Sequence, residues 1–338
     1  MADVLLTRQS VIFAKTETTY GTDVINSATP TATDAILTTL PEFSFDVETY
    51  ERNLARKSLS PLSPRVTNVN CAISFSCEIK GSGTATTPPE IDALLQACGF
   101  TKNVESAAVF YKPDTTASKS CTIYMFQGDP GQLKKITGCV GNVSFSVEQG
   151  GIGLANFEFQ GQFDGTAAFG SGANAVSIPP ANYQEELPPI AQNIAFAYGS
   201  DTAFDCTNFE LNMNNEIQNV KSMQSTDLTA TNFFLSGRAP SGSFNPLLEA
   251  AMTTEDVIAN LASSAARHIM FNLGTDTGNI VIFRLGASQS SGTVTDNNAV
   301  TLTNIGFEDS DGLARYNCEY MLGATFDTGN DEVLIEFK

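Results

Sequence analysis

Val143-Ser144-Phe145-Ser146-Val147-Glu148 is the stretch from which the fold can be derived. Apolar side chains occupy every second position, and serine or glutamate fills the positions between them. Successive side chains of a β-strand point to opposite faces, so the stretch predicts a strand with one apolar and one polar face. A glycine-rich turn follows, and residues 157–160 then repeat the alternation as Phe-Glu-Phe-Gln. The segment predicts a hairpin in a sheet that covers a core on one face and meets water on the other.

The same pattern extends outward in both directions. Residues 43–47 and 73–79 alternate in the same way, and apolar strands are predicted again in the second half of the chain. Only two helices are predicted. Residues 87–99 have prolines near the start and apolar side chains at helical spacing, and residues 254–261 begin with a threonine that can cap the helix. The chain is therefore predicted to be mainly β.

The order of these elements occurs twice. In each half, two strands joined by a loop precede a helix, and two hairpins follow it, which predicts a duplicated domain. The proline-rich segment 179–189 reads as a stiff crossover between the copies. We therefore expect one domain at residues 1–182 and a second at residues 183–338. Residues 1–180 hold 12 basic and 17 acidic side chains (net −5), and the remainder holds 6 and 20 (net −14).

Composition disfavours several classes of function. Lys plus Arg number 18 against 37 for Asp plus Glu, a net charge of −19. Attractive binding to nucleic acid or anionic lipid needs a basic surface. A single histidine cannot build a histidine-rich metal site, and seven cysteines without a CxxC pair predict reduced core thiols. We expect no catalytic residue, no cofactor and no metal site. Without a signal peptide or a membrane-length apolar run, we expect folding in a cytoplasm.

Three short motifs have a chemical and a structural interpretation. His268 could be a general base, but we favour a surface residue at the start of a strand. Asp309-Ser310-Asp311-Gly312 is similar to the start of a calcium loop, but it lacks the later ligands, so we favour a hairpin turn. Gly81-Ser82-Gly83 lacks the Lys-Ser/Thr of a phosphate loop, and we interpret it as a flexible strand exit.

The loop at residues 50–65 has an unusual composition for this acidic chain. It holds four of the 18 cations, and three leucines stand between or near its prolines. The loop is either an ordinary surface loop or an arm that reaches a neighbouring copy, where cations meet acid and leucines fill a groove. The composition favours self-assembly through seven residues: Arg52, Leu54, Arg56, Lys57, Leu59, Leu62 and Arg65.

Over nearly its whole length the sequence resembles the tail tube proteins of tailed bacteriophages, in the branch whose chains carry two tube domains. The resemblance rests on the order and spacing of short segments, none of which is a catalytic motif. These segments are residues 13–22, 32–37, 51–52, 81–83, 94–100, 238–243, 309–312 and 331–338.

The resemblance implies two tandem β-sandwich or half-barrel domains, each with one flanking helix and a long loop. It implies a structural protein that polymerises into stacked rings, whose inner sheets join into a barrel around a channel for viral DNA. Three two-domain chains would form each pseudo-hexameric ring. The protein would be part of the virion tail, made in the host bacterial cytoplasm, without membrane contact. Its further partners would be tape-measure, tail-tip and tail-terminator proteins.

Two sets of residues have places in such a tube. The arm at residues 50–65 is expected to contact a subunit of the adjacent ring. The polar strand faces are expected to line the lumen, where weak repulsion lets DNA pass without specific binding. The candidate lumen carboxylates are Glu42, Asp46, Glu48, Glu78, Glu148, Glu158, Glu210 and Glu319. Two alternatives stay open: a secretion-system or other non-phage β tube subunit, and a monomeric β-sandwich binding protein.

Overall fold

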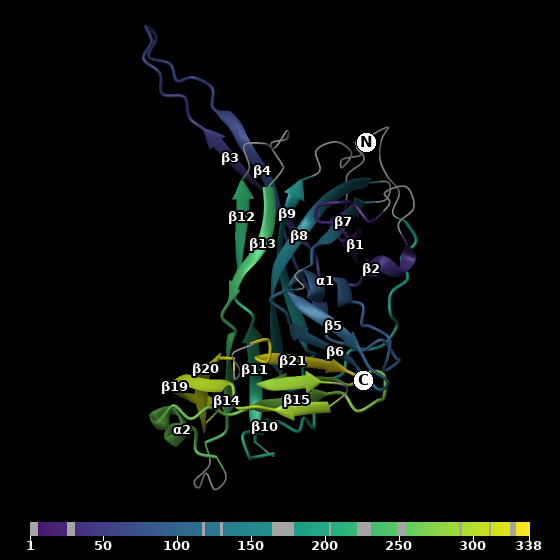
Figure 1. The fold of residues 1–338 in the computed structure, drawn as a ribbon, viewed down its shortest axis with the longest axis vertical. Helices are drawn as coiled ribbons and strands as arrows, with labels where there is room; N and C mark the ends of the chain where they lie inside the picture. Colours follow the sequence, from purple (N-terminus) through teal and green to yellow (C-terminus); the bar gives the residue numbers. More distant parts are fainter. Residues whose placement is uncertain are drawn as a thin grey trace.

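The computed structural model is mainly β, as the alternation predicts (Figure 1). It describes residues 6–25, 31–116, 119–128, 131–163, 179–202, 204–221, 231–248, 255–290, 293–310, 312–324 and 329–338. No helix within these ranges is long and apolar enough to cross a membrane.

Eight antiparallel strands, which we call the eight-strand sheet, form the main part of the largest sheet. Neighbouring strands follow the order β3-β4-β9-β8-β11-β14-β20-β19. The sheet runs from the first half of the sequence into the second because β8 pairs with β11. The bounds are β3 Glu42–Tyr50, β4 Arg65–Glu78, β8 Gly131–Glu148, β9 Leu154–Phe163, β11 Cys206–Asn212, β14 Ser241–Pro246, β19 Val300–Ser310 and β20 Leu313–Leu322.

A second layer packs on the apolar face of this sheet. The early part of β8, before a bulge between Thr137 and Val140, pairs with β7, beyond which lie β1 and β2. Beside them, six strands follow the order β10-β15-β16-β21-β6-β5. The C-terminal strand β21 pairs with both β16 and β6, so this layer also joins the two halves of the chain. The bounds are β1 Ser10–Thr16, β2 Ala35–Ile36, β5 Phe100–Val104, β6 Val109–Pro113, β7 Cys121–Gly128, β10 Ala197–Tyr198, β15 Ile269–Leu273, β16 Val281–Leu285 and β21 Val333–Phe337.

Two ribbons and three short helices complete the described fold. The ribbons pair β12 Asn215–Lys221 with β13 Thr231–Arg238, and β17 Ala287–Ser290 with β18 Thr293–Asp296. The helices are η1 Ala32–Asp34, α1 Asp92–Ala97 and α2 Val257–Ser263. Helix α1 is shorter than the predicted 87–99. Helix α2 is capped by Asp256, whose carboxylate accepts from Ile258 N and Ala259 N. The predicted cap Thr254 lies outside the described residues.

Aromatic side chains between the layers form the core. Phe209 of β11 meets Phe271 of β15 edge to face, with ring centroids 4.5 Å apart, and Phe271 stacks on Phe283 of β16 at 5.1 Å. Phe145 of β8 also contacts Phe283, at 5.2 Å. These side chains come from the inward positions of the alternating pattern, and aromatic pairs at such distances add packing energy beyond area burial. The predicted one-sided core is therefore confirmed.

The order of strands in the eight-strand sheet repeats within the chain. In the first half β3-β4-β9-β8 lie side by side, and in the second β11-β14-β20-β19 do. In each set the last two strands of the sequence form a hairpin, and the second strand of that hairpin is an inner strand of the set. Helices α1 and α2 follow the corresponding strands β4 and β14 in the sequence. Both sheets run across the predicted boundary at residue 182. The division into domains 1–182 and 183–338 stays a prediction.

A glycine contact holds the two halves together. Gly81 N donates to Asn279 Oδ1 at 2.7 Å, and Gly83 N donates to Gly278 O at 3.0 Å. Gly81 is buried, and a Cβ there would overlap the carbonyl oxygen of Gly278. The expectation of a flexible strand exit at residues 81–83 is therefore wrong. The missing side chains let two backbone segments approach closely.

The crossover segment is held beside this contact. Lys80 Nζ donates to Gln184 O at 2.7 Å, and Gln184 Oε1 accepts from Glu90 N at 2.9 Å. Lys80 also lies 3.7 Å from the Glu90 carboxylate, and both side chains are buried. Burial raises the pKa of Glu90 above its ordinary value. These bonds fix the crossover against the residues that immediately precede α1.

Replacing Gly81 with alanine should destabilise the subunit. The added Cβ would also lie 2.8 Å from Asn279 Cα, so backbone must move apart, at a cost of about 1–3 kcal/mol. Chemical denaturation followed by circular dichroism measures the loss. The control is Gly323→Ala, where no described atom lies within 4 Å of the added Cβ. Equal stability of the two variants would contradict the close contact.

A second polar network orders α2 and its neighbours. Arg267 Nε donates to Glu255 Oε2 at 2.8 Å, Ser200 N donates to Glu255 Oε1 at 3.0 Å, and Asn260 Nδ2 donates to Glu255 Oε2 at 3.0 Å. Desolvation raises the pKa of Glu255, but the bonds from Arg267, Ser200 and Asn260 outweigh it and lower that pKa to about 2. The folded state therefore favours the ionised carboxylate.

Stability should fall in acid through Glu255. Its pKa is depressed in the folded state, so its contribution is complete above about pH 4.5 and is lost as the pH falls toward about 2. We expect Glu255→Gln to cost about 1–3 kcal/mol of unfolding free energy at pH 7 and much less near pH 2. Denaturant titrations across this range test it, with the exposed Glu185→Gln as control. A pH-independent difference between Glu255→Gln and the parent would contradict the assignment.

Candidate functional site

The polar face of the eight-strand sheet is the first candidate site. Cross-strand register places Ser74 of β4 between Glu42 of β3 and Glu158 of β9. Strands lie about 4.7–4.9 Å apart, so the two carboxylates stand roughly 9–10 Å apart at the backbone. Like charges directly opposite each other are thereby avoided. The second half repeats this spacing with Glu210, Ser243 and Glu319.

All eight predicted carboxylates lie on this one face by strand register. Six of them are exposed, while Glu48 and Glu78 are half-buried. Glu48 Oε1 lies 2.6 Å from Lys221 Nζ, and the bond from Lys221 lowers the pKa of that carboxyl. Arg315 also stands on this face, but it is 9% exposed and donates to Asn245 O. Arg65, opposite Tyr50 at the arm end of β4, is an exposed cation on this face, so the exposed charge of the described face is predominantly, not wholly, acidic.

The two outer strands of the eight-strand sheet are the second candidate site. Within the described residues β3 pairs with β4 alone, and β19 pairs with β20 apart from a bridge at Val300. Phe45 and Val47 on β3 are 46% and 44% exposed, and Phe307 on β19 is 74% exposed. Alternation puts Phe45 and Val47 on the core face, so burial was the natural expectation. Among the described strands none lies beyond β3, so these side chains have no neighbouring strand on that side.

The pairing of β8 with β11, which we call the internal junction, shows how such edges join. Phe145 lies opposite Leu211, and Met213 N donates to Val143 O at 3.1 Å. The apolar side chains on the core side are closed off from solvent. Val143 is 0% exposed, and Leu211 and Met213 are each 1% exposed.

The repeated strand order aligns the open edges with this junction. The bulges of β8 and β19 occupy the same place in their hairpins. Val143 and Phe307 follow their bulges by the same number of residues, so the two positions correspond. The cross-strand pairs of β4 with β9 and of β14 with β20 extend this correspondence to β3 and β11. Phe45 then corresponds to Leu211, and Val47 corresponds to Met213. The exposed apolar side chains of the outer strands thus occupy positions that the internal junction buries.

The arm is the third candidate site and extends the β3–β4 hairpin beyond the body of the molecule (Figure 1). Leu54 is 63% exposed and Leu59 is fully exposed at the tip, while Leu62 is half-buried. Arg56 is exposed, and its guanidinium donates to Ser60 O and Pro61 O, which holds the tip of the arm together. The remaining predicted cations Arg52, Lys57 and Arg65 are exposed.

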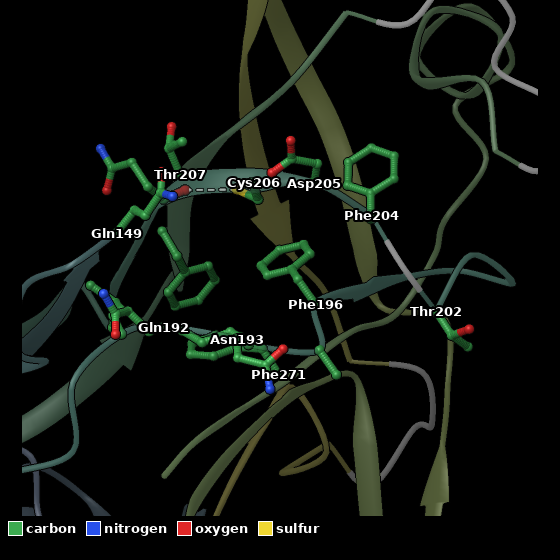
Figure 2. Close-up of a pocket in the computed structure, with 16 residues that line it drawn as sticks. Gln149, Gln192, Asn193, Phe196, Thr202, Phe204, Asp205, Cys206, Thr207 and Phe271 are labelled. Carbon is green, nitrogen blue, oxygen red and sulfur yellow. Dashed lines mark hydrogen bonds between the residues drawn. The ribbon is translucent and has the colours of Figure 1, made fainter.

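A hollow of about 620 Å³ opens where β8 ends and β11 begins (Figure 2). Its apolar lining includes Phe196, Phe204 and Phe271, and its polar lining includes Gln149, Gln192 and Asp205. Sequence reasoning missed it because the lining comes from segments that are separate in the chain. The run of phenylalanines between residues 196 and 209 was the one signal available.

The thiol among the described residues that line the hollow is not activated. Burial raises the pKa of the Cys206 thiol to about 11, so it stays protonated at neutral pH and is a poor nucleophile. No group of three or more metal-ligating side chains occurs among the described residues. Apolar walls with a polar rim instead suit the burial of an apolar side chain.

The short motifs of the sequence make structural hydrogen bonds among the described residues. His268 precedes β15, with its Nδ1 3.5 Å from Asn298 Oδ1. Gly312 N donates to Asp309 Oδ1 at 2.8 Å, which is the bond of a hairpin turn. Asp311 lies outside the described residues.

Comparison with known proteins adds an independent finding. Residues 7–319 match a protein family described as phage tail tube protein. The matched range contains the arm, both outer strands and the internal junction. No curated protein matches the chain.

Proposed function

Because the chain belongs to the phage tail tube protein family, it is a structural subunit of the tube in the virion tail, and we propose that three copies close each ring of that tube. Each chain supplies two sets of four strands in the same order. Three chains then supply six such sets, arranged as a pseudo-hexamer. On this proposal residues 1–182 and 183–338 are the two tube domains.

The internal junction is the observation that carries this proposal. It joins the last strand of the first set, β8, to the first strand of the second set, β11. Applied between chains, the same geometry joins β19 of one subunit to β3 of the next. The alignment then places Phe307 opposite Val47 of the neighbour, and the exposed apolar side chains of both edges become buried. Strand edges with unpaired backbone groups are ready to pair in this way.

A ring closed in this way leaves an open bore. Three chains contribute 24 strands to the barrel. With ordinary strand spacing and tilt, such a barrel has a backbone diameter of roughly 45–50 Å. The core side of the sheet is covered by the second layer, so the polar face is the one left to line the lumen. The acidic carboxylates there repel DNA over about 8–10 Å, and no basic patch holds it.

The stacking of rings completes the tube. We expect the arm to contact the adjacent ring, since it extends the strands of the barrel wall beyond the body of its own subunit. The ends of the tube and its lumen would meet the tail-tip, tail-terminator and tape-measure proteins. Synthesis in the host cytoplasm accords with the seven free cysteines of the fold.

Cross-linking at the ring seam should give covalent trimers. In Val47→Cys combined with Phe307→Cys, the two thiols of neighbouring subunits would face each other across the proposed pair. A short bismaleimide should convert assembled protein to trimers and to nothing larger in denaturing gels. Each single variant serves as control. A ladder reaching six chains would contradict the trimeric ring, and assembled tubes without cross-links would contradict the β19–β3 seam.

Phe307→Asp should abolish rings while the subunit stays folded. The side chain is 74% exposed in the isolated chain, so folding loses little, whereas the seam would bury an unpaired carboxylate. Size-exclusion chromatography with light scattering and negative-stain imaging reads out assembly. Ile258→Asp, at an exposed position of α2, is the matched control and should assemble normally. Assembly of both variants would argue against the seam.

Reversing charge on the polar face should make the tube bind DNA. We expect tubes of the triple variant Glu158→Lys, Glu210→Lys and Glu319→Lys to retain a linear duplex at low salt and to release it as salt rises. Parent tubes should retain none. Co-sedimentation of labelled duplex with tubes measures this. Equal retention by parent and variant tubes would mean that this face does not line the lumen.

A further inference from the structure

The hollow and the arm lie at opposite ends of the barrel wall. Register puts the start of β4, at the arm, beside the end of β9, with Asn70 opposite Gln162. The other end of β9 lies beside the last residues of β8, with Leu154 opposite Ser146. The hollow opens at that end, and Figure 1 shows the arm and β10 at opposite ends of the long axis.

A second, more acidic hollow of about 480 Å³ adjoins the first and shares Gln192 and Asn193 with it. Glu185, Glu186 and Asp276 lie along it. Leu187 and Ile190 are also on its surface, with 80% and 56% of their area exposed. This end of the subunit therefore presents exposed apolar surface and carboxylates side by side.

The arm has the complementary chemistry. Leu54 and Leu59 are exposed, and Arg52 and Lys57 are exposed cations in the same short loop. Individual exposed ion pairs are worth only about 0–1 kcal/mol, so the leucines must supply much of the binding. The described chain carries this arm at one end and these two adjoining hollows at the other, so each subunit could bind one subunit above it and one below it.

We propose that the two hollows at the end of β8 form the receptor for the arm of a second copy in the adjoining ring. The tip leucines enter the aromatic hollow, and the cations face Glu185 and Asp276. The proposal rests on the proposed tube function and names the contact that stacks its rings.

The packing of both partners supports this fit. Phe204 lies within 6.4 Å of Phe196 and within 5.4 Å of Tyr198, measured between ring centroids, so the aromatic wall is already in place. In the arm, the bonds from Arg56 to the backbone of Ser60 and Pro61 shape the tip before it docks. Binding between preformed partners loses less conformational entropy. Many arms then act together along a tube.

Site-directed cross-linking tests the contact in assembled tubes. Leu59→Cys combined with Gln192→Cys, treated with a bismaleimide, should link chains of successive rings into ladders. The control pair is Leu59→Cys with Ser263→Cys, which is exposed on α2 and is not among the residues that line either hollow. Tubes that form but give no ladder with Gln192→Cys would overturn the receptor assignment and leave the tube function intact. A parent protein that never forms rings or tubes would instead overturn the proposed function.

A charge exchange gives a second readout. Glu185→Lys with Asp276→Lys should shorten tubes several-fold, and so should Arg52→Glu with Lys57→Glu, while trimeric rings still form. Combining all four changes should restore much of the tube length, because opposite charges face each other again. Arg56 is left unchanged because it holds the arm tip. Tube lengths are measured by negative-stain imaging. If the tubes of the combined variant are no longer than the shorter tubes of the two double variants, the proposal is contradicted.

Discussion

The pairing of β8 with β11 is the interaction on which the rest of the structure depends. It joins the two sets of four strands into one sheet, and it shows how the ends of such sets meet: antiparallel, with apolar side chains closed off on one face and polar ones left on the other. A strand pair of this kind is a backbone interaction, so it can repeat wherever the same edges meet. The outer strands β3 and β19 carry the same pattern of side chains, and among the described strands each pairs along one side only, apart from the bridge at Val300.

The polar face follows from the same constraint. Once a second layer covers the apolar face, every second residue of eight strands must stand on the other side. Serine, asparagine and spaced carboxylates keep that side wet and acidic without placing like charges in direct opposition. Two of the cations near it have partners: Lys221 pairs with Glu48, and the guanidinium of Arg315 donates to a backbone carbonyl. Such a surface suits a channel for a polyanion, because it offers no site where DNA would be held.

The two ends of the wall differ in kind. One end carries an extended arm that buries little of itself, and the other carries hollows with packed aromatic walls. A subunit with unlike ends makes head-to-tail contacts, which extend into open filaments rather than closing on themselves. In the proposed assembly, side-to-side pairing closes a ring, whereas end-to-end contact stacks rings into a tube, and the two contacts use separate surfaces.

The sequence by itself determined which residues share a strand face, that the chain is mainly β, and that one loop is basic and rich in leucine. These properties are local: a period of two residues and the composition of a short segment can be read without knowing what pairs with what. Only the tertiary structure decided that Phe45, Val47 and Phe307 stand at open edges, that residues 81–83 are packed against Gly278, and that separate segments enclose a hollow. Alternation gives an edge strand and a central strand the same pattern. An edge strand and a central strand differ in their long-range pairing, which depends on the whole chain rather than on the spacing of apolar residues within the strand.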